Sequence, residues 1–210
     1  MKIRFSAPRD EIRSDLETVA HALKVLFGFG FGVVLLFFVF WWDARLDSPF
    51  AETGPTEIIQ SLLLLASSAL FFLEARRSPE TRNALILAGG FLGCMLIREQ
   101  DYYFDMIAHG CWKWPAFALA GVCLAQAARS PRQTLAALAK LIRWRYFPFL
   151  LSGVVIVLAY SRLFGMSALW KPLLPDGDWR PTKNAVEESS ELLGYAFIFS
   201  SALLLRRGKA

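Results

Sequence analysis

The chain has 210 residues, of which 55% are hydrophobic, and its 23 Lys and Arg against 18 Asp and Glu give a formal net charge of +5. The apolar residues form long blocks rather than narrow stripes, which is typical of a chain in lipid and excludes an ordinary soluble globule. We expect the basic residues to lie beside anionic lipid headgroups, so the positive charge gives no ground for nucleic acid binding.

Six apolar blocks predict an all-α, polytopic membrane protein that forms one domain over residues 1–210. The blocks cover residues 25–42, 58–73, 84–97, 114–128, 147–164 and 192–205. A membrane-spanning helix needs about 20 residues. Because the third, fourth and sixth blocks are shorter, each span must include flanking polar residues, which brings charge to the membrane interface.

The segment before the first block predicts an amphipathic helix on the cytoplasmic membrane surface, within residues 1–23. Ile12, Leu16, Val19 and Leu23 recur at helical spacing, opposite charged residues. The first block itself is interpreted as an uncleaved anchor, because no small-x-small cleavage site follows it.

The distribution of Lys and Arg over the loops predicts the orientation. Sixteen of the 23 basic residues lie before the first span, between the second and third, between the fourth and fifth, or after the sixth. The positive-inside rule places these segments and both termini in the cytoplasm. Assuming a bacterial source, we expect the inner membrane. A second, basic interfacial helix is predicted within residues 129–146, and residues 165–184 form the longest extracytoplasmic loop.

The second span begins with a polar stripe. Pro55 suits the first helical position and Glu57 lies in the first turn, where helix capping alone would explain it. Gln60 and Ser61 continue on the same side of the helix. This side is therefore predicted to face protein or water rather than lipid.

The connection between the third and fourth blocks, residues 98–113, combines charge, aromatic residues and a histidine. On an unbroken helix one face collects Arg98, Asp101, Asp105 and His109. Glu99 would point elsewhere. If the helix breaks, Asp105 and His109 still pair at i, i+4, a spacing that suits two ligands of one metal or a carboxylate that orients an imidazole. A plain surface histidine is the alternative for His109.

The sixth span begins with an acidic helix face. Four side chains lie within about 100° of one another on a helical wheel: Glu187, Glu188, Glu191 and Tyr195. Three acids exceed what a helix start requires.

We therefore expect the polar ends of the second, third and sixth spans to converge on one outward-facing pocket, because charge at the lipid boundary is costly unless it is paired or hydrated. The expected members are Glu57, Arg98, Asp101, Asp105, His109, Glu187 and Glu191. The alternative is that these groups stand hydrated in the headgroup region and need no partner.

The first functional hypothesis is a non-enzymatic membrane protein whose pocket binds a cation or a polar or lipid headgroup, as a transport, sensor or accessory component. The candidate binding residues are Gln60, Arg98, Asp101, Lys113 and Tyr195.

The second hypothesis is a metal-dependent hydrolase or transferase that acts on a lipid or lipid-linked substrate. Its candidate catalytic residues are Glu57, Asp105, His109 and Glu188. A divalent metal ion would be held by members of the set Asp101, Asp105, His109, Glu187 and Glu191. The chain has no HExxH or GxSxG motif, which counts against this hypothesis. The third hypothesis is a structural or assembly subunit that contacts a membrane-protein partner or a second copy of the chain.

Overall fold

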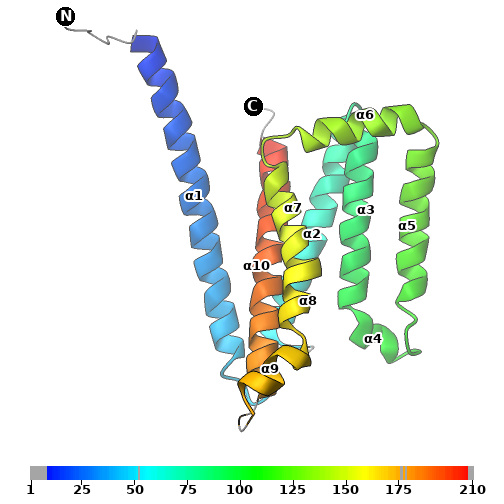
Figure 1. The fold of residues 1–210 in the computed structure, drawn as a ribbon. Helices are drawn as coiled ribbons and strands as arrows, with labels where there is room; N and C mark the ends of the chain where they lie inside the picture. Colours follow the sequence, from blue (N-terminus) through cyan, green and yellow to red (C-terminus); the bar gives the residue numbers. More distant parts are fainter. Residues whose placement is uncertain (1–8, 52, 176, 178, 208–210) are drawn as a thin grey trace, which may run out of the picture. The chain divides into compact units, whose positions relative to one another are not determined.

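The computed structural model describes residues 9–51, 53–175, 177 and 179–207, and within these residues it is all-helical, without a strand. The elements in chain order are α1 (Arg9–Asp43), α2 (Pro55–Arg77), α3 (Arg82–Glu99), α4 (Asp101–Asp105), α5 (Lys113–Ala128), α6 (Pro131–Ile142), α7 (Phe147–Val155), the π-helix η1 (Ile156–Tyr160), α8 (Ser161–Phe164), α9 (Ser167–Leu173) and α10 (Trp179–Arg207) (Figure 1). Two compact units, Met1–Phe38 and Val39–Ala210, make up the chain and are described separately.

The first unit consists of most of α1. The predicted surface helix and the first apolar block belong to this one continuous helix, apart from residues 1–8, which lie outside the described residues. No Gly or Pro lies between Val19 and Leu26 to break the helix. Many apolar side chains of the first unit are exposed, among them Phe27 and Phe31.

Among the described residues, three helical segments are long and apolar enough to cross a membrane: Glu11–Asp43, Pro55–Arg77 and Phe147–Phe164. The other three predicted spans are also helices, but they do not reach that standard. Helix α5 has only 16 residues, α3 carries Arg and Glu at its ends, and α10 has a charged first half. The structure therefore supports three spans by length and composition rather than six.

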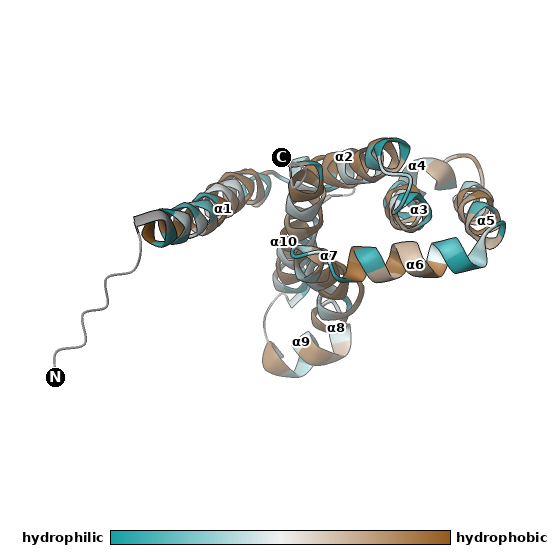
Figure 2. Ribbon diagram, turned by 90° about the horizontal axis from the view of Figure 1, so that it is seen from above, coloured by the Kyte–Doolittle hydropathy of each residue, from teal (hydrophilic) through white to brown (hydrophobic). Residues whose placement is uncertain are grey.

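In the second unit, α2 packs against α3 and α10, α5 packs against α3, and the segment from α7 to α8 packs against α10. Leu64 and Phe71 of α2, Leu92 of α3 and Ile198 of α10 are buried in the shared core. Helix α6 lies across one end of this bundle, and α4 and α9 lie at the other end, here called the α9 end (Figure 1). Seen from above, the bundle helices are mainly apolar (Figure 2).

The start of α2 is held by a carboxylate from the end of α1. Asp43 is fully buried, and it accepts hydrogen bonds from the backbone N–H of Phe50 at 3.1 Å and of Thr56 at 2.9 Å. A Cβ at Gly54 would lie 3.0 Å from this carboxylate. Asp43 thus caps α2, whose own N-cap residue offers no side-chain hydrogen bond, and this fixes where the first turn carrying Glu57 begins.

Glycine allows α7 and α10 to cross closely. A Cβ at Gly153 would lie 2.6 Å from the carbonyl oxygen of Gly194, so neither residue has room for a side chain. Beyond this crossing the helix passes through the π-helical turns of η1 before α8 begins. A π-turn changes the register of the following residues. As a result Ser161, the first residue of α8, is buried against α10.

The α9 end differs from the expectation of open loops. Helix α3 ends at Glu99 and the short α4 follows, so residues 98–109 do not form one unbroken helix. Within the predicted loop 165–184 the structure forms α9 and the first turn of α10, while Asp176 and Asp178 lie outside the described residues. The helix predicted within residues 129–146 is confirmed as α6.

Candidate functional site

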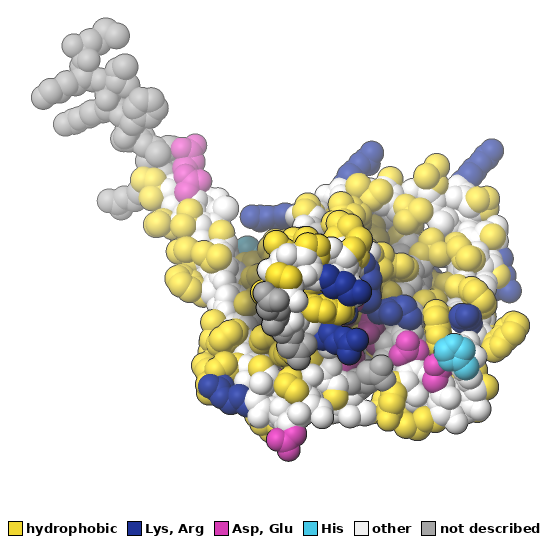
Figure 3. Space-filling model, turned by 60° about the horizontal axis from the view of Figure 1, so that its bottom comes forward, with side chains coloured by type: hydrophobic (Ala, Val, Ile, Leu, Met, Phe, Trp, Pro, Cys, Tyr) yellow, Lys and Arg dark blue, Asp and Glu magenta, His cyan; other side chains and the backbone are white. Residues whose placement is uncertain are grey.

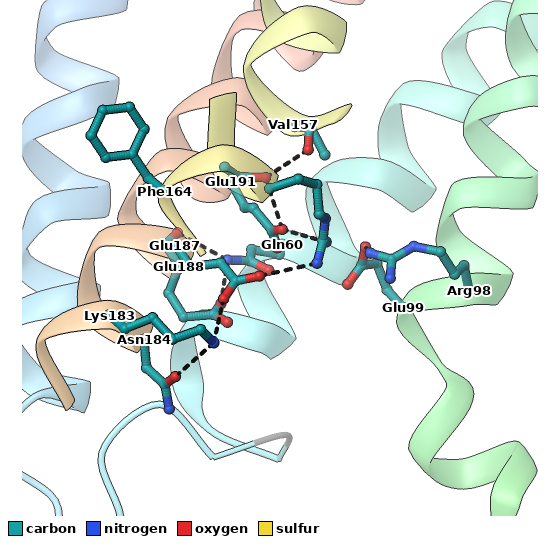
Figure 4. A network of polar contacts seen from close by, with 12 residues as sticks. Gln60, Arg98, Glu99, Val157, Phe164, Lys183, Asn184, Glu187, Glu188 and Glu191 are labelled. Carbon is teal, nitrogen blue, oxygen red and sulfur yellow. Dashed lines mark hydrogen bonds and ion pairs between the residues drawn. The ribbon is translucent and has the colours of Figure 1, made fainter. Parts of the chain in front are cut away.

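Polar side chains from α2, α3, α8 and α10 meet near the α9 end of the bundle. We call them the polar network, and its members are Glu57, Gln60, Arg98, Glu99, Ser161, Arg162, Lys183, Glu187, Glu188, Glu191 and Tyr195. Figure 4 shows most of them pointing toward one another from separate helices. The predicted convergence of the second, third and sixth spans is thus present for a part of the predicted set.

Glu191 is the most deeply buried carboxylate of the network, with 4% of its side chain exposed. Its Oε1 accepts hydrogen bonds from the hydroxyl of Ser161 at 3.1 Å and from the guanidinium of Arg162 at 2.5 Å. Both donors come from α8, directly after the π-helix. Glu191 therefore has the charged partner that a buried carboxylate needs.

Arg162 also joins a second carboxylate. Its guanidinium donates to Oε1 of Glu187 at 3.0 Å, and Lys183 donates to Oε2 of the same carboxylate at 2.8 Å. Glu187 is therefore compensated by two cations. The Arg162 side chain is 45% exposed, so this layer of the network reaches solvent.

Arg98 and Glu99, at the end of α3, form a further ion pair of the network. The hydroxyl of Tyr195 on α10 donates a hydrogen bond to Oε1 of Glu99 at 2.9 Å. Only 7% of the Glu99 side chain is exposed, and Tyr195 is fully buried. This cluster links the end of α3 to the middle of α10.

Gln60 connects α2 to α10 and leaves an acceptor unused. Its amide nitrogen donates to the carbonyl oxygen of Glu188 at 3.2 Å and to Oε2 of the Glu188 carboxylate at 2.9 Å. Gln60 is fully buried, yet its Oε1 has no hydrogen-bond partner. If the side-chain amide were rotated by 180°, Oε1 would face two acceptor oxygens and neither hydrogen bond could form. The contacts therefore assign the orientation of the amide. A buried acceptor without a partner is unusual and points to a missing donor.

Glu57 is half-buried and lies one turn before Gln60 on α2. It makes no hydrogen bond or ion pair with any described residue. The charges that act on it are those of three carboxylates, led by Glu188, and the more weakly acting Arg98. Glu57 is therefore an uncompensated carboxylate.

The network contains more acidic than basic side chains. It contains the five carboxylates of Glu57, Glu99, Glu187, Glu188 and Glu191 and the three cations of Arg98, Arg162 and Lys183. All three cations contact Glu99, Glu187 or Glu191. The two acids left over are Glu57, one turn before Gln60 on α2, and Glu188 on α10, whose carboxylate accepts a hydrogen bond from the amide nitrogen of Gln60. Such an arrangement attracts a positively charged group.

The other predicted site residues form a separate, exposed group. Asp105 accepts hydrogen bonds from Nδ1 of His109 at 2.8 Å and from the backbone N–H of Gly110 at 2.7 Å. The Gly110 N–H, followed by His109, holds the pKa of Asp105 below its ordinary value. The His109 side chain is 98% exposed, and Asp101 and Lys113 are exposed as well.

This group does not join the polar network. The break after Glu99 turns α4 away from the axis of α3, so the i, i+4 pair of Asp105 and His109 forms, but the four-residue stripe with Arg98 does not. Within the described residues, no three His, Cys, Asp or Glu side chains are grouped as metal ligands would be. The predicted metal set is thus divided between two places. Acidic side chains and a histidine lie together on the surface in Figure 3.

Sequence reasoning missed four members of the network: Glu99, Ser161, Arg162 and Lys183. The helical wheel directed Glu99 away from Arg98, but the two side chains pair where the helix ends. Arg162 carried a usable signal, because it is a lone base near the end of the fifth apolar block. Lys183 lies four residues before Glu187, which is the spacing of a helical ion pair.

Comparison with known proteins found no matching family model, no matching curated protein and no matching solved structure.

Proposed function

We propose that this chain is a six-span protein of the bacterial inner membrane that binds a cationic group at its outward-facing polar network, as a transport, sensor or accessory component. The binding groups are the carboxylates of Glu57 and Glu188 and the amide oxygen of Gln60. The observation that carries this proposal is that Gln60 is fully buried with its Oε1 unpartnered, while its amide nitrogen contacts Glu188 and neither Glu188 nor Glu57 forms an ion pair with a described base.

The six-span topology has support from the bundle. Helices α2, α3, α5, α7 and α10 run side by side and alternate in direction (Figure 1). The charges of α3 lie at its two ends, as expected of a helix whose ends reach the membrane surfaces. The carboxylates gather at the α9 end, while α6 and the last turn of α2 supply Lys and Arg at the other end. With the positive-inside rule, this favours a cytoplasmic α6 and cytoplasmic termini.

Helix α6 has the composition of a helix that lies on anionic lipid. Thr134, Ala137 and Leu141 are buried against the bundle, whereas Leu135 and Ile142 are 71% and 58% exposed. Exposed apolar residues next to Arg132 and Arg143 suit a membrane surface.

The cation-binding hypothesis explains features of the polar network that the other two hypotheses leave unexplained. A metal-dependent hydrolase would need several protein ligands at one place, and the described side chains do not form such a group. An assembly role would be served by the paired charges of Glu99, Glu187 and Glu191 but gives no reason for leaving Glu57 unpaired.

Thermal unfolding of the purified, detergent-solubilised chain tests the proposal. The probes are Na⁺, K⁺, Mg²⁺, Ca²⁺ and ethylammonium chlorides at matched ionic strength. A bound cation stabilises the folded state by an amount that grows with the logarithm of its concentration above its Kd, and reaches about 2.7 kcal/mol at 100 times its Kd. We expect one class of cation to raise the unfolding temperature of the wild type and of Asp101→Asn, an exposed acid outside the network, but not of Glu57→Gln. Equal responses of all three proteins to every cation would refute the proposal.

A further inference from the structure

We propose that the group bound between Glu57, Gln60 and Glu188 is a primary ammonium group, R–NH₃⁺. This inference rests on the proposed function and names the class of ligand that the site takes. An aminolipid headgroup and a free primary amine both present this group, with the same three N–H donors.

The acceptors belong to two helices that are in direct contact. Glu57 and Gln60 are three residues apart on α2 and so lie on the same face of that helix. The hydrogen bond from Gln60 to the Glu188 carboxylate brings in α10, at 2.9 Å (Figure 4). Glu188 is also the first of the charged groups that act on Glu57. The two acids and the Gln60 amide therefore lie in one part of the bundle, where α2 packs against α10.

The donors of an ammonium group match this set. R–NH₃⁺ has three N–H donors and no acceptor, and the site offers one acceptor group from each of three side chains. Two of these are carboxylates, so the hydrogen bonds are charge-assisted. The same contact supplies the donor that Gln60 Oε1 lacks. One ligand group would thus remove both the charge imbalance and the unsatisfied buried acceptor.

Other cations match the site less well. A quaternary ammonium group has no N–H and would leave Gln60 Oε1 without a donor. Calcium and magnesium complete their coordination with water, so the number of side-chain oxygens does not exclude them, but the described residues hold no group of three His, Cys, Asp or Glu side chains placed as metal ligands. These alternatives become outcomes of the experiment.

Carbodiimide labelling of the wild-type protein provides the test without relying on a variant that must fold. The reagent modifies carboxyl groups in apolar surroundings, and peptide mass spectrometry locates the label. The rate of labelling at Glu57 is measured with ethylammonium, tetramethylammonium or magnesium chloride at equal ionic strength. Glu74, a buried acid near the other end of α2, is the internal control.

We expect ethylammonium to slow the labelling of Glu57 in a saturable manner and to leave Glu74 unchanged, while tetramethylammonium has no effect. In Gln60→Leu, which keeps the size of the side chain but removes its oxygen, protection should need an about ten-fold higher ethylammonium concentration. Asp101→Asn should behave as the wild type. Nanodiscs with and without phosphatidylethanolamine identify the source: protection by this lipid alone indicates a headgroup, and protection by added amine alone indicates a free ligand.

Two further outcomes separate this inference from the proposed function. Equal protection of Glu57 by magnesium or tetramethylammonium would overturn the ammonium assignment and leave cation binding in place. Labelling of Glu57 at one rate under every condition would overturn both. If Gln60→Leu fails to fold, the wild-type comparison of ethylammonium with tetramethylammonium still decides the assignment.

Discussion

The hydroxyl of Tyr195 on α10 donates a hydrogen bond to Oε1 of Glu99, the last residue of α3, at 2.9 Å. Tyr195 is fully buried and Glu99 is nearly so. This hydrogen bond holds the Glu99–Arg98 pair of α3 against α10, the helix that carries Glu188 and Glu191.

Replacing Tyr195 by Phe removes this donor and leaves a buried carboxylate with one fewer partner. We expect a loss of about 1.5–3 kcal/mol in the free energy of unfolding, as for other hydrogen bonds to charged groups. Titration with a denaturing detergent measures this loss. Tyr160→Phe is the control, since Tyr160 is 46% exposed and its ring stacks on Phe164. Equal stability of the two variants would contradict the assigned bond.

Arg162→Met should destabilise the fold because it leaves Glu191 buried without a charged partner. We expect a loss of about 2 kcal/mol, below the full value for a buried ion pair because the Arg162 side chain is 45% exposed. The double variant Arg162→Met, Glu191→Gln should recover part of the loss, because it removes the charge that was left unpaired. Strictly additive effects in this mutant cycle would show that the pair does not interact.

The stability of the connection from Asp105 to Gly110 should depend on pH. Folding lowers the pKa of Asp105, mainly through the Gly110 N–H, so ionised Asp105 favours the folded connection above its unfolded pKa of about 3.9. That contribution is lost as the pH falls through the lower folded-state pKa. The stability difference between wild type and Asp105→Asn should therefore be present at neutral pH and vanish in acid. Hydrogen exchange of the Gly110 amide reports the change locally, and a difference that stays constant down to low pH would contradict the assignment.

The proposed topology predicts opposite accessibility for two exposed positions. In a chain whose native cysteines are replaced by alanine, His109→Cys should react with a membrane-impermeant maleimide from outside intact cells. Arg132→Cys on α6 should react only after the membrane is opened. Both positions are exposed in the structure, so burial within the protein does not explain a difference. Labelling of both from the same side would refute the six-span arrangement.

Hydrophobic blocks and helix periodicity predicted much of the fold and part of the site. All six apolar blocks lie in helices, and the acidic face from Glu187 to Tyr195 lies at the polar network. These features are local, since each depends on one continuous stretch of the chain.

The features that the sequence did not predict depend on where helices end and on which residues of other helices they contact. The helical wheel for residues 98–109 assumed one unbroken helix, but α3 ends at Glu99, so Asp105 and His109 pair with each other instead of with the network. Arg162 reaches Glu191 after a π-helix, and a 3.6-residue period cannot predict that change of register. The structure is likewise needed to see that Glu57 is unpaired, because each base of the polar network must first be assigned to another acid.

Isothermal titration of ethylammonium chloride into wild-type protein, Glu57→Gln and Asp101→Asn tests the central claim most directly. Tetramethylammonium chloride at the same concentration gives the heat of dilution and of general ionic effects. The account predicts saturable binding of one ammonium group per chain in the wild type and in Asp101→Asn, and none in Glu57→Gln. Identical heats in the wild type and in Glu57→Gln would contradict it.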